Sequence, residues 1–364
     1  MVDLQQFWTE SDLSLAQPFS INKPRVPVIV SVDDHWLLEA MHVESTVRFY
    51  SDADYRARVQ RQCNRDTEVA LGRAFFPEEV FAHPPKRIEE VFGATQVLTE
   101  GGTPWLEPGI TTIEELVALL RHVEHLDLAE SVFPDEYEAE ADCWRDAGRP
   151  VPVLGTSIRG PATVGTSVCG TMNYLHWALD YPEIMRDFAS LLAVRAGDYL
   201  RLVRARTGAP ATGLKILDDN CCLLSPHLYE RLGYPVLRAL FDEFSPRPAA
   251  AGGDERYQHS DSAMAHLLPF FRELRMTALN LGPTIHPLTI RLGVPTAVVH
   301  GQVPPATLAD GTRDEIRAAV QRDIEAIGAD GGMVLTTAGS VRAGTTIEHI
   351  LWFLAAADEF GRYH

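Results

Sequence analysis

Short apolar runs that alternate with longer helical segments constrain the fold of this chain more than any other feature. Seven such runs are found, at residues 26–32, 150–158, 213–219, 256–261, 277–282, 296–301 and 332–337. Helical segments separate the later runs, and parallel strands need crossover connections of this kind. The pattern therefore predicts an α/β fold with parallel strands.

An eight-stranded barrel needs one strand more than the seven runs supply. The best place for it is between residues 66 and 100, where residues 67–76 read TEVALGRAFF. The apolar segments are short and evenly spread over 364 residues, which favours one large domain over two. We therefore expect a single TIM-like (β/α)8 barrel over residues 25–364, preceded by an N-terminal extension over residues 1–24.

The first residues of several helices are recognisable. Residues 112–115, 312–315 and 345–348 each place Thr three positions before Glu, which is the pattern of a capping box. Ser225 precedes Pro226, and proline is favoured at the first position of a helix. We expect helices to begin at these four places.

Composition and charge exclude several classes of protein. The net charge of -18 opposes binding to nucleic acid or to an anionic membrane through a basic surface. The five cysteines have neither zinc-finger nor disulfide-framework spacing, and we see neither an export signal nor about 18 uninterrupted apolar residues. We expect a soluble, cytoplasmic protein that acts on a small molecule and leave its oligomeric state open.

Polar residues end the predicted strands, and in an α/β barrel these ends form the active face. His259 and Asp261 lie two positions apart, so both side chains can point to the same side of a strand and hold a metal or a substrate. A hydrogen-bonded pair that stiffens a loop is the alternative. His266, five residues after Asp261, is a secondary candidate that more simply packs in a helix.

Other strand ends supply candidates for proton transfer and binding. Asp218 and Asp219 end one run, where one carboxylate can act as acid or base and the other can form the turn. Arg159 could clamp a carboxylate or form a surface ion pair. The remaining candidates are Asn280, His300 and Gln302 for substrate binding and Cys221 as a tentative metal ligand, although Cys221 and Cys222 are more often buried apolar residues.

Several sequence blocks resemble the uroporphyrinogen decarboxylase superfamily in order and spacing. The resemblance runs from about Val151 to the C-terminus, with a looser match near residues 25–36, and it rests on the blocks IRGPATVGTSVCG, LDDNCCLLSPHLYERLGYPVLRALFDEF, HSDSAMAHLLPFFRELRMTALNLGP, HGQVPPATLADGTRDEIRAAVQRDIEAIGADGGMVLTTAGS and EFGRYH. The resemblance implies a TIM-like barrel with a deep cleft at the carboxyl ends of its strands.

The superfamily contains porphyrinogen decarboxylases and corrinoid- or coenzyme M-linked methyl- and alkyltransferases. The decarboxylases have an arginine-rich N-terminal segment and a histidine near the last strand, whereas this chain has Asp33 and Asp34 in the first region and LTTAGSVRAG in the second. The methyltransferase branch holds zinc through a His-x-Cys pair and a later Cys. Here His259-Ser260-Asp261 occupies the first position and Ala338-Gly339 the second, so the thiolate ligands are absent.

The resemblance favours methyl or small-alkyl transfer, with a corrinoid carried by a partner protein. In this scheme His259 and Asp261, with Cys221 as a third candidate, hold a divalent metal, most simply zinc, and Asp219 is the acid or base. Arg159, Asp218, Asn280, His300 and Gln302 then bind the substrate. Decarboxylation of a small carboxylic acid and a catalytically silent binding barrel are the two alternatives.

Overall fold

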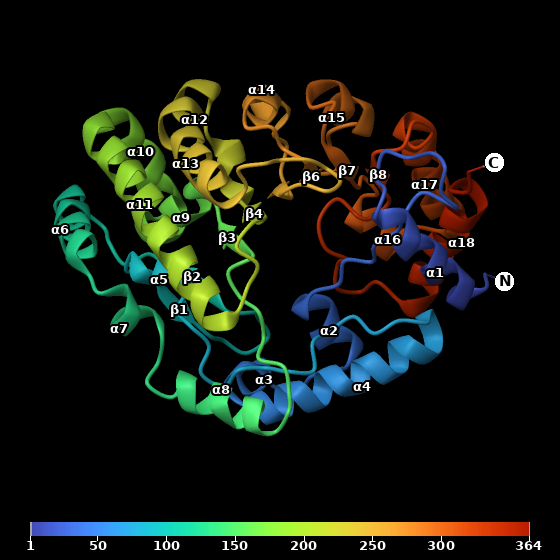
Figure 1. The fold of residues 1–364 in the computed structure, drawn as a ribbon, viewed down its shortest axis with the longest axis horizontal. Helices are drawn as coiled ribbons and strands as arrows, with labels where there is room; N and C mark the ends of the chain where they lie inside the picture. Colours follow the sequence, from blue (N-terminus) through green and yellow to red (C-terminus); the bar gives the residue numbers. More distant parts are fainter. Residues whose placement is uncertain (1, 364) are drawn as a thin grey trace. The chain divides into compact units, whose positions relative to one another are not determined.

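The computed structural model describes residues 2–363 of the chain (Figure 1). It contains two compact units. Unit 1 comprises Met1–Thr46, Tyr55–Glu78 and Arg247–His364, and unit 2 comprises Val47–Asp54 and Glu79–Pro246. Unit 1 is assembled from three separate stretches of chain, whereas unit 2 is almost continuous. The division into an extension over residues 1–24 and a barrel over residues 25–364 stays a prediction.

Unit 1 contains four short strands joined by helices. Its strands are β5 (Arg256–His259), β6 (Ala278–Asn280), β7 (Val298–His300) and β8 (Met333–Val334), which pair in parallel in that order. Figure 1 shows α14 and α15 on one side of β6 and β7. The helices of this unit are α1 (Leu4–Leu15), α2 (Asp34–Ala40), most of α4 (Ala53–Leu71), η2 (Ala265–Leu267), α14 (Leu268–Glu273), α15 (Pro287–Gly293), α16 (Pro305–Asp310), α17 (Arg313–Ile327) and α18 (Ile347–Phe360).

Alternation along these strands builds an apolar layer. Residues paired across parallel strands point to the same side of the sheet, and successive residues point to opposite sides. Ala278, Val298 and Val334 form one buried cluster, and Tyr257 and Ile29 pack against it. We call the side of the sheet that carries this cluster the interior face of unit 1; the opposite side, with Leu279 and Val299, is buried as well.

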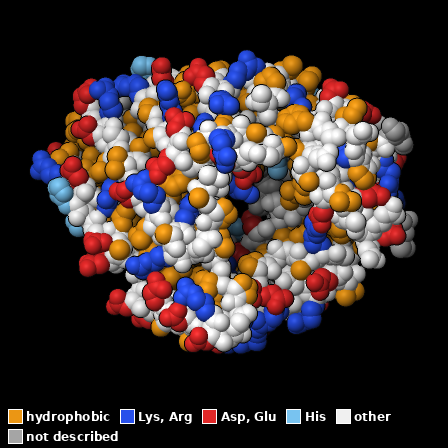
Figure 2. All heavy atoms as spheres, in the orientation of Figure 1, with side chains coloured by type: hydrophobic (Ala, Val, Ile, Leu, Met, Phe, Trp, Pro, Cys, Tyr) orange, Lys and Arg blue, Asp and Glu red, His pale blue; other side chains and the backbone are white. Residues whose placement is uncertain are grey.

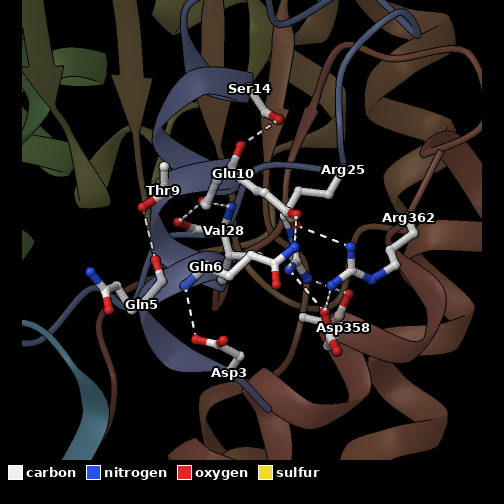
Figure 3. A network of polar contacts seen from close by, with 12 residues as sticks. Asp3, Gln5, Gln6, Thr9, Glu10, Ser14, Arg25, Val28, Asp358 and Arg362 are labelled. Atoms are coloured by element: carbon white, nitrogen blue, oxygen red, sulfur yellow. Dashed lines mark hydrogen bonds and ion pairs between the residues drawn. The ribbon is translucent and has the colours of Figure 1, made fainter.

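The N-terminal helix and the C-terminal helix of unit 1 are joined through a buried arginine (Figure 3). Arg25 has no exposed side-chain surface, its Nη1 lies 3.1 Å from Asp358 Oδ1, and its guanidinium stacks 3.6 Å from the centre of the Phe7 ring. Arg362 adds contacts to Asp358 at 2.8 Å and to Glu10 at 3.1 Å. A buried guanidinium is costly without such partners, so this network fixes α1 against α18.

Unit 2 is mainly helical and contains two pairs of strands. The strands β3 (Ser157–Arg159) and β4 (Leu214–Leu217) are parallel, and β1 (Thr95–Val97) and β2 (Trp105–Glu107) are antiparallel. The helices are most of α3 (Thr46–Ser51), α5 (Ile88–Val91), α6 (Ile113–His125), α7 (Leu128–Val132), α8 (Tyr137–Asp146), α9 (Pro161–Cys169), α10 (Thr171–Asp180), α11 (Pro182–Thr207), η1 (Asp219–Leu223), α12 (Pro226–Leu232) and α13 (Tyr234–Phe244).

The predicted helix starts are confirmed at three places and shifted by one residue at the fourth. Thr112 and Thr312 form complete capping boxes before α6 and α17. Ser225 accepts a hydrogen bond from the Leu228 amide at the start of α12. At α18 the capping residue is Thr346 instead of Thr345, because its hydroxyl accepts from the His349 amide.

Two strand predictions in the N-terminal part differ from the structure. Residues 67–71, predicted as strand, belong to α4, so the proposed missing strand is wrong at this position. The polar residues of this segment continue the helical pattern that begins at Ala53. This longer pattern outweighs the few apolar residues at the end of the helix. Residues 26–32 form only a bridge, in which Val28 pairs in parallel with Leu335.

The surface of the molecule carries mixed charge. Figure 2 shows acidic and basic side chains interspersed over the face in view. Among residues 2–363, no helix has the length and apolar character needed to cross a membrane.

Candidate functional site

A polar layer follows the apolar layer of unit 1 toward the carboxyl ends of the strands. His259 pairs with Asn280, and His300 is two residues after Val298 of the apolar cluster. These three side chains therefore point to the interior face, one step beyond the apolar residues. The structure brings together three of the residues predicted for the site.

Asn280 is the centre of this layer and is only 4% exposed. Its amide Nδ2 donates to the carbonyl oxygens of His300, at 2.7 Å, and Thr337, at 3.0 Å. Both partners are acceptors, so the nitrogen of the amide must face them and Oδ1 must face the other way. Oδ1 accepts from the backbone amide of Gly339 at 3.1 Å and lies 2.8 Å from His259 Nδ1.

This arrangement fixes the proton on the ring of His259. Because Asn280 Oδ1 is an acceptor only, His259 Nδ1 must be the donor of their hydrogen bond. The neutral ring then carries its lone pair on Nε2. A donor relation of this kind is how proteins select which histidine nitrogen is offered to a metal or to a proton.

His259 Nε2 faces a carboxylate. It lies 3.4 Å from Asp261 Oδ1, and the His259 side chain is 19% exposed against 61% for Asp261. A lone pair and a carboxylate oxygen repel each other unless a cation lies between them or the ring is protonated. A cation placed between His259 Nε2 and Asp261 Oδ1 would relieve this repulsion.

Gly339 is required at this place by the close approach of Asp261. Its φ is +101°, and a Cβ added there would collide with Asp261 Oδ1. Its backbone amide also donates to Asn280, as described above. Gly339 thus connects the support of His259 with the position of Asp261.

His300 belongs to this layer, and Gln302 follows it two positions later. The His300 ring meets the Tyr257 ring edge to face at 5.6 Å. Gln302 is fully buried, and neither polar atom of its side-chain amide has a hydrogen-bond partner among the described residues. A buried amide without partners is costly, which is consistent with the predicted binding role of Gln302.

The backbone of Gln302 is held by a helix residue that local sequence patterns do not reveal. Its amide donates to Asp323 Oδ2 at 2.9 Å, and Arg322 donates to its carbonyl oxygen at 3.1 Å. Burial raises the pKa of Asp323, while the Arg322 charge and hydrogen bond lower it. Asp323 is on α17 and 21 positions away along the chain, so only the tertiary fold pairs it with Gln302.

In unit 2, Asp218 is bound to the start of α9. Its Oδ1 accepts from the Thr163 amide at 2.8 Å and the Thr163 hydroxyl at 2.9 Å, and Oδ2 accepts from the Ala162 amide at 3.4 Å. Burial raises its pKa to about 6, against the lowering effect of these bonds. A Cβ at Gly160 would collide with this carboxyl group. Asp218 therefore supports the fold, a role its strand-end position did not indicate.

Asp219 and Arg159 are partners in unit 2. The Arg159 Nη1 lies 3.3 Å from Asp219 Oδ2, and both side chains are about one-third exposed. Arg159 is the last residue of β3 and pairs with Leu217, the last residue of β4. The cation predicted to bind substrate is thus held near a carboxylate that restrains its orientation.

Cys221 and His266 are less suited to metal binding than the sequence suggested. The Cys221 thiol is buried and donates to the Asp218 carbonyl oxygen at 3.0 Å. Burial and the nearby Asp218 charge raise the pKa of this thiol well above its usual range, which opposes the thiolate that a metal needs. His266 lies in η2 with an exposed side chain.

Comparisons with known proteins agree with this architecture. Residues 86–360 match the family described as uroporphyrinogen decarboxylase (URO-D). No curated protein matches the chain. A solved methyltransferase from Methanosarcina mazei is similar to it with a TM-score of 0.62 and 16% sequence identity, covering 97% of this chain and 98% of that chain.

A second solved structure is less similar. It is a B12-independent methionine synthase from Shewanella sp. W3-18-1 in complex with selenomethionine, with a TM-score of 0.42 and 11% identity over 83% of this chain and 85% of that chain.

The family match extends over most of the chain, and the similarity to the Methanosarcina structure extends over nearly all of it. The fold class predicted from the sequence, an α/β fold of the TIM-like barrel type, is confirmed. The chain belongs to the uroporphyrinogen decarboxylase (URO-D) family.

Proposed function

We propose that this protein is an enzyme that transfers a methyl or small alkyl group with the help of a divalent metal. The observation that carries the proposal is the pair formed by His259 Nε2 and Asp261 Oδ1, with the proton of His259 fixed on Nδ1 by Asn280. The sulfur ligands implied by the family resemblance are absent from this pair, so the metal site is richer in oxygen.

The two residues fit a zinc ion. Zn–N and Zn–O bonds of about 2.1 Å that meet at a tetrahedral angle separate the two ligand atoms by about 3.4 Å. The observed separation of Nε2 and Oδ1 is 3.4 Å. When bound, the metal lowers the pKa of a coordinated thiol or water and makes it nucleophilic.

The other predicted residues have defined roles in this proposal. Asp219 follows the carboxyl end of β4, as Asp261 follows that of β5, and acts as the acid or base. His300 and Gln302 orient the substrate on the interior face, and Arg159 binds it. Asp218, predicted to bind substrate, instead holds the start of α9. Gln302 contributes a buried amide whose two polar atoms have no partner among residues 2–363.

The similarity to a methyltransferase supports this choice of reaction, although at 16% identity it shows the fold alone. The methyl group arrives on a corrinoid carried by a partner protein and leaves to a small-molecule acceptor. The five cysteines are free in the structure, which is consistent with a reducing compartment such as the cytoplasm.

Metal content of the full-length protein tests the proposal. We expect about one zinc per chain by inductively coupled plasma mass spectrometry, and loss of it in His259→Ala. His122→Ala, which removes an exposed histidine of α6, is the matched control and keeps the metal. Methyl transfer from methylcobalamin to a thiol is then measured with and without a chelator.

Two results would contradict the proposal. A protein without metal whose activity survives chelation removes the metal from the mechanism. Chelator-insensitive release of carbon dioxide from a small carboxylic acid, without methyl transfer, would assign decarboxylation instead. If both activities are absent and the His259 and Asp261 variants keep cellular function, the chain is a binding barrel.

A further inference from the structure

Unit 2 contains a pocket whose lining, apart from Arg159, has no part in the proposed reaction. Its volume is about 430 Å³, within the range of small-molecule sites. It lies between residues 153–159, which lead into and include β3, and residues 84–89, with Tyr199 and Leu217 completing the wall. All of these residues belong to unit 2, so the pocket is complete within one compact body.

Glu89 is the most unusual residue of this wall. It is only 2% exposed, and apart from its own backbone amide no hydrogen-bond or ion-pair partner of its carboxylate is found among residues 2–363. Burial raises its pKa, while the charges of Arg87 and Arg159 lower it. A buried acid whose one hydrogen bond comes from its own backbone amide is costly, and a ligand that donates a further hydrogen bond would stabilise it.

The other residues that line the pocket indicate which further chemical groups the ligand has. Arg87 is exposed at the edge of the pocket and immediately precedes α5, and Arg159 contributes a second positive charge although it is held by Asp219. Ile88, Leu154 and Ile158 provide apolar surface between them. The pocket therefore combines a cation for a carboxylate, an acceptor for a hydrogen-bond donor and an apolar wall.

We propose that this pocket binds a small carboxylic acid that carries an amino or hydroxyl group next to the carboxylate and an apolar side chain. The carboxylate binds Arg87, the amino or hydroxyl group donates to Glu89, and the side chain packs on Ile88 and Leu154. This inference does not depend on methyl transfer or on a metal in unit 1.

A matched series of ligands tests it by isothermal titration calorimetry on the full-length chain. Phenylalanine, phenyllactate and 3-phenylpropionate share the carboxylate and the ring and differ only in the donor next to the carboxylate. We expect phenylalanine and phenyllactate to bind at least about tenfold more tightly than 3-phenylpropionate, because only they satisfy Glu89. Failure of all three to bind, or equal binding of all three, overturns the proposal.

Variants of Glu89 and Arg87 test which group of the ligand each residue binds. Glu89→Leu should bind all three compounds within about threefold of one another, because it no longer distinguishes the donor. It should also melt at a higher temperature, since it removes a buried acid whose one hydrogen bond comes from its own backbone amide. Arg87→Gln should weaken all three about tenfold and keep their ratio.

Glu124→Gln provides the control, because Glu124 is an exposed carboxylate of α6 in the same unit. It should reproduce the wild-type affinities. If the preference for the donor survives in Glu89→Leu, Glu89 does not recognise the ligand and the proposal is wrong. Glu89→Gln, which keeps the shape of the side chain, replaces Glu89→Leu if the latter does not fold.

Discussion

Two aspartates follow neighbouring strands of the chain sequence, Asp218 after β4 and Asp261 after β5, and they meet opposite environments. Asp218 is fully buried, and its carboxyl group accepts three hydrogen bonds from Thr163 and Ala162. Asp261 is 61% exposed and lies opposite His259 Nε2. One carboxyl group is occupied by the backbone of a helix, and the other is presented to a ligand.

The difference shows that a position at a strand end does not separate support from chemistry. Both residues sit where barrel enzymes place their active groups. What distinguishes them is the nature of their partners. Amide donors at a helix start satisfy the Asp218 carboxylate, whereas Asp261 lies 3.4 Å from a ring nitrogen of His259.

The largest effect is expected from removing the buried carboxyl group. Asp218→Ala leaves two amides and a hydroxyl without their acceptor and opens a cavity, which should lower the free energy of unfolding by about 4 kcal/mol. Urea denaturation at pH 5 measures this loss. The proposed zinc site of His259 and Asp261 should be unaffected, so the folded fraction of Asp218→Ala should contain as much zinc as the wild type. A parallel loss of metal would show that the two regions are not independent.

The next prediction concerns the pH dependence of stability. Burial raises the pKa of Asp218 from 3.8 to about 6, so the folded state binds this proton more tightly than the unfolded state. Its contribution is fully present below about pH 4 and is lost as the pH rises through about 6. Between pH 4 and pH 7, the wild type should lose on the order of 3 kcal/mol more than Asp218→Asn in urea unfolding. Equal losses in both proteins would rule out this linkage.

A smaller effect on the exposed region is expected from Asn280→Ala. This change removes the acceptor that fixes the proton of His259 on Nδ1, and residues in that role affect metal affinity by about 10- to 100-fold. Competition with a zinc-binding dye measures the affinity. Thr336→Val, which removes a buried hydroxyl two residues after β8 that has no hydrogen-bond partner among the described residues, is a matched comparison and should alter zinc affinity less than about threefold.

The smallest effect is expected at the glycine that touches Asp261. In Gly339→Ala the backbone must hold a positive φ with a side chain and Asp261 must move, at a cost of about 1 to 2 kcal/mol in unfolding free energy. Thermal denaturation and zinc titration are measured together. Wild-type values in both would mean that Asp261 does not depend on Gly339 for its position.

The sequence predicted the elements whose signals are local. The strands from β4 to β8 lie within the apolar runs identified for them, whereas β3 overlaps only the last two residues of the run 150–158. Capping by Thr112 and Thr312 is visible in residues three positions apart. Residues 67–71 were misassigned because a short apolar ending was taken for a strand, whereas the preceding turns of α4 decide its structure.

The candidate site was predicted in part for the same reason. His259, Asn280 and His300 share the interior face because alternation along strands is a local rule. The supports of the candidate residues are distant in sequence: Asp323 holds Gln302, and Thr163 holds Asp218 across 55 positions. Such pairs depend on how helices return to the strands, and no spacing within the sequence encodes them.

The bond network around Arg25 also has a consequence for synthesis on the ribosome. Its partner Asp358 is 333 positions further along the chain, so α1 must wait for the synthesis of α18 before this contact forms. Unit 2, by contrast, is complete once Pro246 has emerged. Synthesis of unit 1 therefore begins before that of unit 2 but is completed after it. A chain that stops before Asp358 has a complete unit 2 but lacks the Arg25–Asp358 contact of unit 1.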